Sequence, residues 1–277
     1  MAGARGIAGR LGTLALGLLL AAGLMLATAW REARRDPVTQ RMTVRLPRWP
    51  AGARAVTVLV WSDLHLGNAA TDGRRLSRLV DRANALRPDL VVLAGDYVAG
   101  HERADAAVAP GLAALTGLRT RLGTVAVLGN HDHWTDASKV RATLAQAGVT
   151  VLANTAVRRG PLAVGGVDDP VTRRDDIAGT VDAMRRLAAA PLIVSHSPDL
   201  APRLPGDVPL LVAGHSHCGQ IVLPGWGPIV SVVRPRYRCG AVREGGRLTV
   251  VTAGTGTSVV PLRLGAPPDW WLLTLGP

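Results

Sequence analysis

The chain has 277 residues and a hydrophobic share of 48%, enough for one α/β domain with a sizeable core and an N-terminal extension. Its 32 glycines and 19 prolines stay below the share that marks low-complexity chains, so a fibrous or intrinsically disordered protein is excluded. The net charge is +12, but residues 1–55 alone hold nine arginines against two acidic residues. Because only 3% of the residues are aromatic, few platforms exist for stacking bases, and we expect no nucleic-acid partner.

The first predicted element is an uncharged stretch over residues 11–30 that has arginines on both sides. About 20 apolar residues suffice for a helix to cross the hydrocarbon core of a bilayer, and Trp30 stands where an interfacial aromatic residue would. The stretch therefore predicts a membrane anchor; a cleaved signal peptide with the pattern Ala27-Thr28-Ala29 and a buried helix are the alternatives. The expected division of the chain is an anchor or signal segment with basic flanks over 1–35, a proline-containing linker over 36–53, and the globular domain over 54–277.

Arginines and cysteines bear on which side of the membrane holds the domain. Six arginines lie within residues 31–48, against Arg5 and Arg10 on the other side of the apolar stretch. The positive-inside rule then predicts a single-pass protein of the inner membrane with its domain in the cytoplasm, whereas a signal peptide would place the domain outside, in the periplasm. Cys218 and Cys239 are too few for a disulfide scaffold, and one bridge between them is expected only if the domain is exported.

Beyond the predicted linker, short aliphatic runs alternate with helical stretches. Strands are expected at residues 55–61, 88–94, 124–128, 150–154, 162–167, 191–194 and 209–213, and the end of the chain is strand-rich. Helices are expected at residues 74–87, 103–120, 136–147 and 179–189. This alternation predicts an α/β fold with largely buried strands.

Histidine, aspartate and asparagine gather directly after the apolar runs. Asp63 and His65 are two residues apart, as are His215 and His217, so in extended chain each pair points to one face. Strand ends are where open α/β sheets place their ligands. Imidazole, carboxylate and amide oxygen suit divalent ions, and these ligands are too many for one tetrahedral zinc, so two metals sharing a bridging carboxylate are expected. The set consists of Asp63, His65, Asp96, Asn130, His131, His196, His215 and His217.

The same residues stand in recognisable strings. In order and context, residues 55–276 resemble the calcineurin-like metallophosphoesterases, which implies a sandwich of two mixed β-sheets flanked by helices. The strings GDYV, GVDDP, GHSHCGQ and PLRLG are similar to those of small membrane-anchored bacterial phosphoesterases, some of which hydrolyse UDP-2,3-diacylglucosamine in lipid A biosynthesis. The motifs that carry the resemblance are Asp63-Leu64-His65, Gly95-Asp96, Gly129-Asn130-His131-Asp132, Ser195-His196 and Gly214-His215-Ser216-His217.

The resemblance implies an enzyme that hydrolyses a phosphodiester or pyrophosphate bond by attack of a hydroxide that bridges two metal ions. Manganese is expected first, with iron, zinc or magnesium as alternatives. His131 would stay free of metal, face the substrate and protonate the leaving oxygen or stabilise its charge. One ion would be held by Asp63, His65 and His217 and the other by Asn130, His196 and His215, with Asp96 bridging both.

One departure from the family pattern bears on the substrate. Relatives that dephosphorylate proteins carry GDxVDR where this chain has GDYVAG, so the acid that would support His131 is missing and a protein phosphatase is disfavoured. We expect a small-molecule or lipid-linked substrate that contains phosphate, with UDP-2,3-diacylglucosamine as the specific hypothesis, and no obligate protein partner. An exported envelope phosphodiesterase of broad specificity and a metal-binding envelope module with little turnover are the alternatives.

Four polar residues near the motifs are expected to have structural roles only. His101 and His133 are predicted to face solvent in loops, and Asp168 and Asp169 to form a turn before a proline. Cys218 directly follows a predicted metal ligand and is expected to pack rather than to regulate the site.

Overall fold

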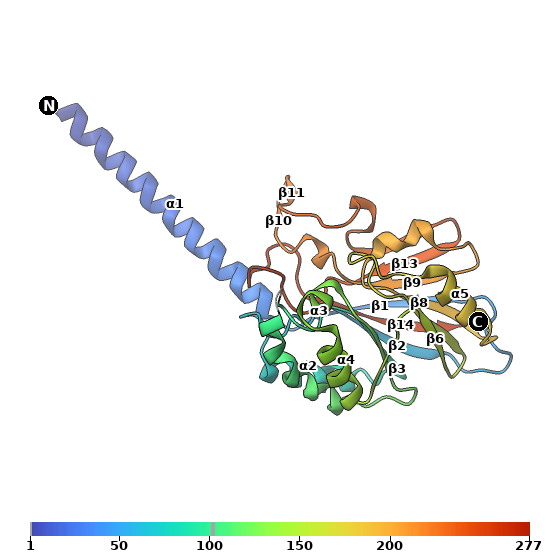
Figure 1. The fold of residues 1–277 in the computed structure, drawn as a ribbon. Coiled ribbons are helices and arrows are strands. Elements are labelled where there is room, and N and C mark those ends of the chain that lie inside the picture. Colours follow the sequence, from blue (N-terminus) through green and yellow to red (C-terminus); the bar gives the residue numbers. More distant parts are fainter. Residues whose placement is uncertain (1, 101–102) are drawn as a thin grey trace.

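Two six-stranded mixed sheets pack face to face (Figure 1), which confirms the sandwich that the resemblance implies. The computed structural model describes the backbone of residues 2–100 and 103–277. The first sheet has the order β1-β14-β2-β3-β4-β5. Its strands are β1 (Val38–Arg45), β2 (Val56–Trp61), β3 (Leu90–Ala94), β4 (Thr124–Val127), β5 (Val149–Val151) and β14 (Asp269–Gly276).

The second sheet has the order β12-β13-β9-β8-β7-β6. Strands β7, β8, β9 and β13 run parallel, and the edge strands β6 and β12 pair antiparallel with their neighbours. These strands are β6 (Thr155–Arg159), β7 (Leu162–Gly166), β8 (Ala190–Val194), β9 (Leu210–Ala213), β12 (Gly240–Glu244) and β13 (Arg247–Val251). A separate two-stranded hairpin consists of β10 (Val222–Leu223) and β11 (Gly227–Pro228).

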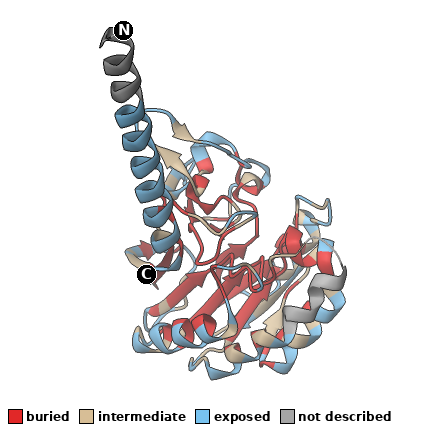
Figure 2. Ribbon diagram, turned by 90° about the vertical axis from the view of Figure 1, so that its left-hand side faces the viewer, coloured by how far each residue is buried: buried red, intermediate tan, exposed pale blue. Residues whose placement is uncertain are grey.

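The central strands are buried on both faces, which explains their nearly continuous apolar sequences. In β2, Val58 and Val60 point into the core between the two sheets, whereas Leu59 and Trp61 point to the helices on the outside. Figure 2 shows the same strands buried along almost their whole length. Burial of each valine or leucine side chain stabilises the fold by about 1.5–3 kcal/mol. Because the strands are buried on both faces, they form a rigid support for the loops at their ends.

Helices cover the two outer faces of the sandwich. The first sheet is covered by α2 (Gly73–Ala85), the 3₁₀ segment η1 (Arg103–Gly117) and α4 (Ala137–Gln146), and the second by α5 (Ile177–Arg185) and η2 (Pro198–Arg203). Helices α2, α4 and α5 each begin after an aspartate whose side chain accepts a hydrogen bond from the amide three residues on. The short α3 (Asn130–Thr135), η3 (His217–Gly219) and η4 (Pro235–Tyr237) lie in loops.

Part of the segment predicted as a linker belongs to the sheet. Residues 38–45 form β1, which pairs in parallel with β14 from Val38 opposite Asp269 to Arg45 opposite Gly276. As an edge strand, β1 buries only part of its surface, so its sequence VTQRMTVR lacks the apolar run of a central strand. The linker prediction for these residues is therefore wrong, and only the short segments on either side of β1 are irregular.

Helix α1 (Ala2–Arg34) projects away from the domain (Figure 1). Its Gly12–Arg34 part has a mean hydropathy of 1.9 and is the one helix of the described chain that is long and apolar enough to cross a membrane. Its leucines over residues 14–26 are exposed, which contradicts the alternative of a buried helix (Figure 2). Among its described side chains, from residue 12 onward, the buried ones are Ala29 and Ala33 in the last turns.

Candidate metal centre

The predicted site residues lie at the carboxyl ends of parallel strands from both sheets. The ends of β2, β3 and β4 carry residues 63–65, 96 and 130–131, and the ends of β8 and β9 carry residues 196 and 215–217. The structure brings seven of these side chains into three overlapping groups whose ligand atoms lie within 4.8 Å of one another. The groups are Asp63 with His65 and His217, His65 with Asp96 and His131, and Asp96 with His196 and His215.

Imidazole nitrogens of the centre face one another in two close pairs. The Nε2 atoms of His65 and His217 are 3.1 Å apart, and Nδ1 of His215 is 3.1 Å from Nε2 of His196. One carboxylate oxygen of Asp96, Oδ2, is 3.5 Å from Nε2 of His65 and 3.2 Å from Nε2 of His196. The carboxylate of Asp96 therefore faces both groups of histidines at once.

These separations fit the coordination shell of small divalent ions. Two ligands bound at about 2.1 Å to one ion lie about 3.0 Å apart in octahedral and about 3.4 Å apart in tetrahedral geometry. Oδ1 of Asp63 and Oδ1 of Asn130 are also buried without a hydrogen-bond partner, an arrangement that costs free energy unless a cation occupies the space before them. The donor set of imidazoles, carboxylates and an amide oxygen therefore fits divalent metal ions.

Burial sets the protonation of the imidazoles. It lowers the pKa of His65 and of His215 to about 3 each, and it lowers the pKa of His217 in the same direction. Neutral imidazole is the form that binds metal ions, so these three rings are held ready to coordinate. His196 is fixed by a different contact, because its Nδ1 lies 2.7 Å from the carbonyl oxygen of Ala94 and donates to it, which leaves Nε2 free to face the centre.

The two carboxylates of the centre differ in their electrostatics. Burial raises the pKa of Asp63 to about 6. Burial alone would also raise the pKa of Asp96, but the adjacent His196 more than offsets this and holds the carboxyl below its ordinary pKa. Asp96 is therefore the permanent negative charge at the middle of the histidine cluster.

The backbone at the site adopts the left-handed conformation, which residues other than glycine rarely adopt. Five of the eight predicted site residues have a positive φ, with values of 51° at Asp63, 45° at His65, 57° at Asp96, 66° at His215 and 48° at His217. The prediction that each i, i+2 pair converges because the chain is extended is therefore wrong in its reason. The side chains converge because the left-handed turns curl the loops around the centre, at a cost of about 1 kcal/mol or more per residue.

Close approach of the loops explains two of the glycines. A Cβ at Gly129 would collide with the carboxylate of Asp96, and a Cβ at Gly214 would collide with Ser62 and the carboxylate of Asp63. Glycine at these two positions lets the backbone pack directly against the side chains of the candidate metal ligands Asp96 and Asp63.

Asp132 supports the centre and was missed as a site residue, although it stands inside the motif GNHD. It is fully buried, and its Oδ2 accepts the amides of Asp96 and Gly129 at 3.0 and 2.9 Å. Its Oδ1 accepts the amides of Tyr97 and Val98 at 2.9 and 3.3 Å. Asp132 thus ties the loop after β3 to the loop after β4, and burial, aided by the charge of Asp96, raises its pKa to about 7.

His131 is oriented by backbone rather than by an acid. Its Nδ1 lies 3.0 Å from the carbonyl oxygen of Gly100, to which the ring donates, and its amide donates to Oδ1 of Asp96. The GDYVAG string has no acid after Asp96, and the carbonyl of its Gly100 provides the support for His131 that the resemblance assigns to an acid. Nε2 of His131 consequently points the other way, 3.5 Å from Oγ of Ser258.

Arg263, from the PLRLG string, is a second supporting residue that the sequence analysis did not assign. Its guanidinium is fully buried beneath the centre and lies 3.3 Å from Nδ1 of His217. It donates to the carbonyl oxygens of five residues, His217, Ala253, Gly254, Gly256 and Ala266. Arg263 thus holds the loop after β13 against the metal-ligand candidates.

Two expectations near the site are corrected. His133 does not face solvent, because its side chain is buried and its Nε2 lies 2.8 Å from Oδ1 of Asp168. The two residues are 35 positions apart, so the local sequence does not reveal this contact. Cys218 does not simply pack, because it forms a disulfide with Cys239. The remaining histidine, His101, lies outside the described residues.

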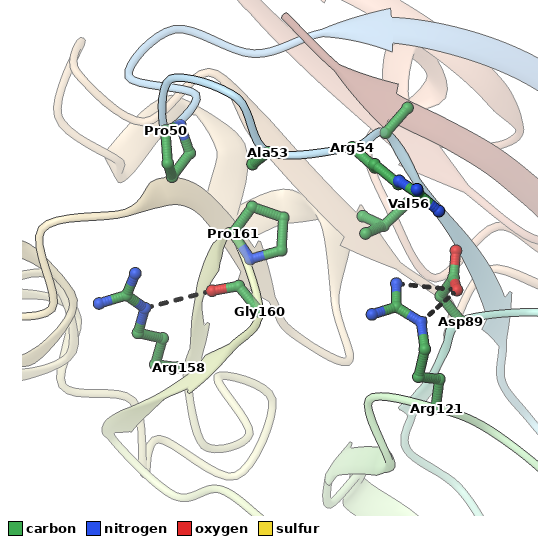
Figure 3. Close-up of a pocket in the computed structure, with 10 residues that line it drawn as sticks. Pro50, Ala53, Arg54, Val56, Asp89, Arg121, Arg158, Gly160 and Pro161 are labelled. Carbon is green, nitrogen blue, oxygen red and sulfur yellow. Dashed lines mark hydrogen bonds and ion pairs between the residues drawn. The ribbon is translucent and has the colours of Figure 1, made fainter.

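A separate cavity of about 550 Å³ lies at the opposite ends of the strands (Figure 3). It is lined by residues that precede β2, β3, β4 and β7, including Arg54 and Arg158, and Arg121 there forms a 3.0 Å ion pair with Asp89. The seven Asp and His side chains of the centre take no part in its lining, so the two features are independent.

Residues 56–219 match the family model described as calcineurin-like phosphoesterase, a span that includes every candidate ligand. The chain belongs to this family. It is a metal-dependent phosphoesterase, and the family together with the Asp and His groups points to divalent metal ions.

Two relatives of similar length align with most of the chain. The chain is 29% identical to the metallophosphoesterase YkuE of Bacillus subtilis over 96% of this chain and 95% of that one. It is 28% identical to a metallophosphoesterase of Aquifex aeolicus over 85% of this chain and 90% of that one. A transmembrane protein with a metallophosphoesterase domain from Danio rerio is 28% identical over 84% of this chain, which covers 56% of that longer protein.

Proposed function

We propose that this phosphoesterase hydrolyses a phosphodiester or pyrophosphate bond at a centre of two divalent ions. One ion would be held by Asp63, His65 and His217, and the other by Asn130, His196 and His215. The observation that carries the proposal is the position of Asp96, whose Oδ2 faces His65 of the first group and His196 of the second and so can bridge the two ions. When bound, such a pair of ions activates a water nucleophile and neutralises charge on the phosphate oxygens.

The residues of the chain supply orientation and a proton. His131 donates from Nδ1 to the carbonyl oxygen of Gly100, which directs Nε2 toward Oγ of Ser258. In the protonated ring this Nε2–H is a donor for the oxygen of the leaving group. Asp132 and Arg263 keep the loops around the ions in place through their buried hydrogen bonds.

Hydrolysis of bis-p-nitrophenyl phosphate with added Mn²⁺ tests the proposal. We expect His131→Ala to reduce kcat by about 10²–10⁴-fold, the range of a general acid, while metal binding persists. Asp96→Ala should abolish both hydrolysis and the binding of the ion pair. Arg158→Ala, in the cavity at the far ends of the strands, is the matched control and should hydrolyse at the wild-type rate.

The outcome also separates the competing functions. Metal binding without hydrolysis by the wild-type chain would favour a binding module over an enzyme. Full activity of Asp96→Ala would contradict the two-ion centre. UDP-2,3-diacylglucosamine, the substrate hypothesis from the sequence resemblance, is tested by release of UMP from the detergent-solubilised protein, and its failure leaves phosphoesterase chemistry intact.

We further propose that α1 anchors the domain in the membrane and that the domain faces the oxidising side. Support for the anchor is the exposed apolar face of Gly12–Arg34. Support for the exported placement is the disulfide between Cys218 and Cys239, because disulfides persist in oxidising compartments. Labelling with a membrane-impermeant thiol reagent, before and after reduction of intact cells, distinguishes this placement from the cytoplasmic one that the arginine count predicts.

A further inference from the structure

Exposed apolar side chains gather at one place on the domain. Outside α1, the described chain exposes eight large hydrophobic side chains, and six of them lie in two segments, residues 226–232 and 259–260. Trp226 is 91% exposed and Val259 is 79% exposed. We call these six residues the apolar lip; they are Trp226, Ile229, Val230, Val232, Val259 and Val260. Patches of this kind on a soluble face mark a contact with another apolar phase or molecule.

The two segments of the lip are joined into one surface. Nε2 of Gln220 donates to the carbonyl oxygens of Ser258 and Val260 at 3.0 and 3.1 Å, and its Oε1 accepts the amide of Ser258 at 2.7 Å. The amide of Val222 donates to the carbonyl oxygen of Leu264. The disulfide between Cys218 and Cys239 closes the base of the longer segment. The lip is therefore held by hydrogen bonds and by a covalent link, and it is not a loose loop.

The lip borders the catalytic centre. Ser258 directly precedes Val259 and lies with its Oγ 3.5 Å from Nε2 of His131. At the other segment, Cys218 follows His217, which belongs to the Asp63 and His65 group. A substrate that approaches His131 from this side consequently passes along the apolar lip.

The lip also stands beside the predicted membrane anchor. In Figures 1 and 2, the β10–β11 hairpin rises from the same side of the domain as α1. The end of α1 is fixed to the lip's own loop, because the amide of Arg263 donates to the carbonyl oxygen of Ala29 at 3.0 Å. Nη2 of Arg75 holds the carbonyl oxygen of Arg35 at 3.1 Å. The membrane-crossing part of α1 and the hairpin are thus attached to one rigid domain on one side.

Charge around the lip matches a bilayer surface. Residues 219–234 and 256–265 contain no aspartate or glutamate. Exposed arginines flank the apolar side chains, with Arg31 and Arg35 at the end of α1 and Arg234 at the end of the longer segment. Apolar side chains with an arginine border are typical of surfaces that enter the headgroup region and attract anionic lipids.

We propose that the apolar lip dips into the bilayer that α1 crosses, so that the catalytic centre opens at the membrane surface and acts on a phosphoester or pyrophosphate carried by a membrane amphiphile. The second half of this inference rests on the proposed phosphoesterase activity, and the first half rests on the proposed anchoring by α1. The lip lets the acyl chains remain in the apolar phase while the phosphate reaches His131. A second copy of the chain is the competing occupant of the same surface.

The membrane contact is tested with the full chain in nanodiscs of phosphatidylcholine and phosphatidylglycerol whose acyl chains carry bromine. Bromine quenches tryptophan fluorescence on contact, and we expect the quenched signal to fall when Trp226→Ser removes the exposed ring of the lip. Equal quenching of the wild type and of Trp226→Ser would overturn the membrane contact. Chemical crosslinking of the same nanodiscs through the lip into dimers, without quenching of Trp226, would assign the surface to a second copy instead.

The substrate class is tested with two p-nitrophenyl diesters, one soluble and one amphiphilic. Enzymatic hydrolysis of p-nitrophenyl hexadecyl phosphate in the nanodisc yields p-nitrophenolate and hexadecyl phosphate. Bis-p-nitrophenyl phosphate is the soluble counterpart. We expect the variant Trp226→Ser/Ile229→Ser/Val259→Ser to lose at least tenfold in kcat/KM on the hexadecyl ester and to stay within twofold on the soluble one. Val171→Ser, which removes an exposed apolar side chain outside the lip, is the matched control and should change neither rate.

The possible failures are distinguishable. If the wild type cleaves the soluble ester and the lip variant loses equally on both substrates or on neither, the lip has no role in substrate choice and the inference is wrong. If the wild type cleaves neither ester, the proposed function fails and the substrate half of the inference fails with it, while the bromine quenching still decides the membrane contact.

Discussion

Replacing Asp132 should weaken the centre and the fold together, in proportion to the acceptors that are removed. Oδ2 accepts the amides of Asp96 and Gly129, and Oδ1 accepts those of Tyr97 and Val98. An asparagine keeps one oxygen and so leaves two of the four buried amides without an acceptor, whereas an alanine leaves all four. At a lower bound of about 1 kcal/mol for each buried donor left unpaired, Asp132→Asn costs at least about 2 kcal/mol and Asp132→Ala at least about 4 kcal/mol.

The loss is measured by urea unfolding of the metal-free protein in EDTA, so that metal binding does not mask it. Because the donors include the amide of Asp96, the same variants should lose metal affinity and kcat for bis-p-nitrophenyl phosphate. Asp136→Ala, which removes only the cap of α4 through the amide of Lys139, is the matched control and should cost about 1 kcal/mol with activity unchanged. Equal stability and activity of Asp132→Asn and Asp136→Ala would refute the supporting role of Asp132.

Three further results are expected. Cys239→Ser opens a loop that spans 21 positions and should lower the free energy of unfolding by about 3 kcal/mol, as a fluorescence-monitored denaturant titration would show; an unchanged midpoint would contradict the disulfide. Arg263→Met leaves the buried carbonyl oxygens of Ala253, Gly256 and Ala266 without their donor and should cost at least about 3 kcal/mol, with Arg263→Lys losing less; equal losses would contradict the hydrogen-bonding role. Although burial raises the pKa of Asp89, hydrogen bonds from Thr57 and Arg121 lower it overall from 3.8, so its stabilising effect is present above that pH and is lost on acidification. Unfolding of Asp89→Asn at several pH values should therefore converge with the wild type in acid, and a constant difference would contradict the shift.

The sequence predicted which side chains gather at the centre better than it predicted the backbone conformation that brings them together. The positions of aspartate and histidine directly after apolar runs were enough to predict that Asp63, Asp96 and His196 lie close together, because the carboxyl ends of parallel strands meet at one edge of a sheet. The left-handed turns at Asp63 and His65 could not be read from residue spacing, because the conformation is imposed by neighbouring loops and not by local preference.

Contacts between distant segments account for what the sequence analysis missed. Strand β1 is held by β14 from the other end of the chain, so its own polar sequence carries no signal of a central strand. The support of His131 by the carbonyl oxygen of Gly100 is invisible in a sequence, because every residue has a carbonyl. Asp132 and Arg263 also bind backbone groups, which a sequence does not distinguish from one residue to the next. Only the position of the two residues inside the GNHD and PLRLG strings indicated a role.

Anomalous diffraction from crystals of the full chain grown with Mn²⁺ locates the bound ions. Two manganese peaks per chain are expected on either side of the Asp96 carboxylate, one beside His65 and the other beside His196, and the pair should be lost in Asp96→Ala. A single peak, or ions bound away from the ends of β2, β3, β8 and β9, would contradict the two-ion centre.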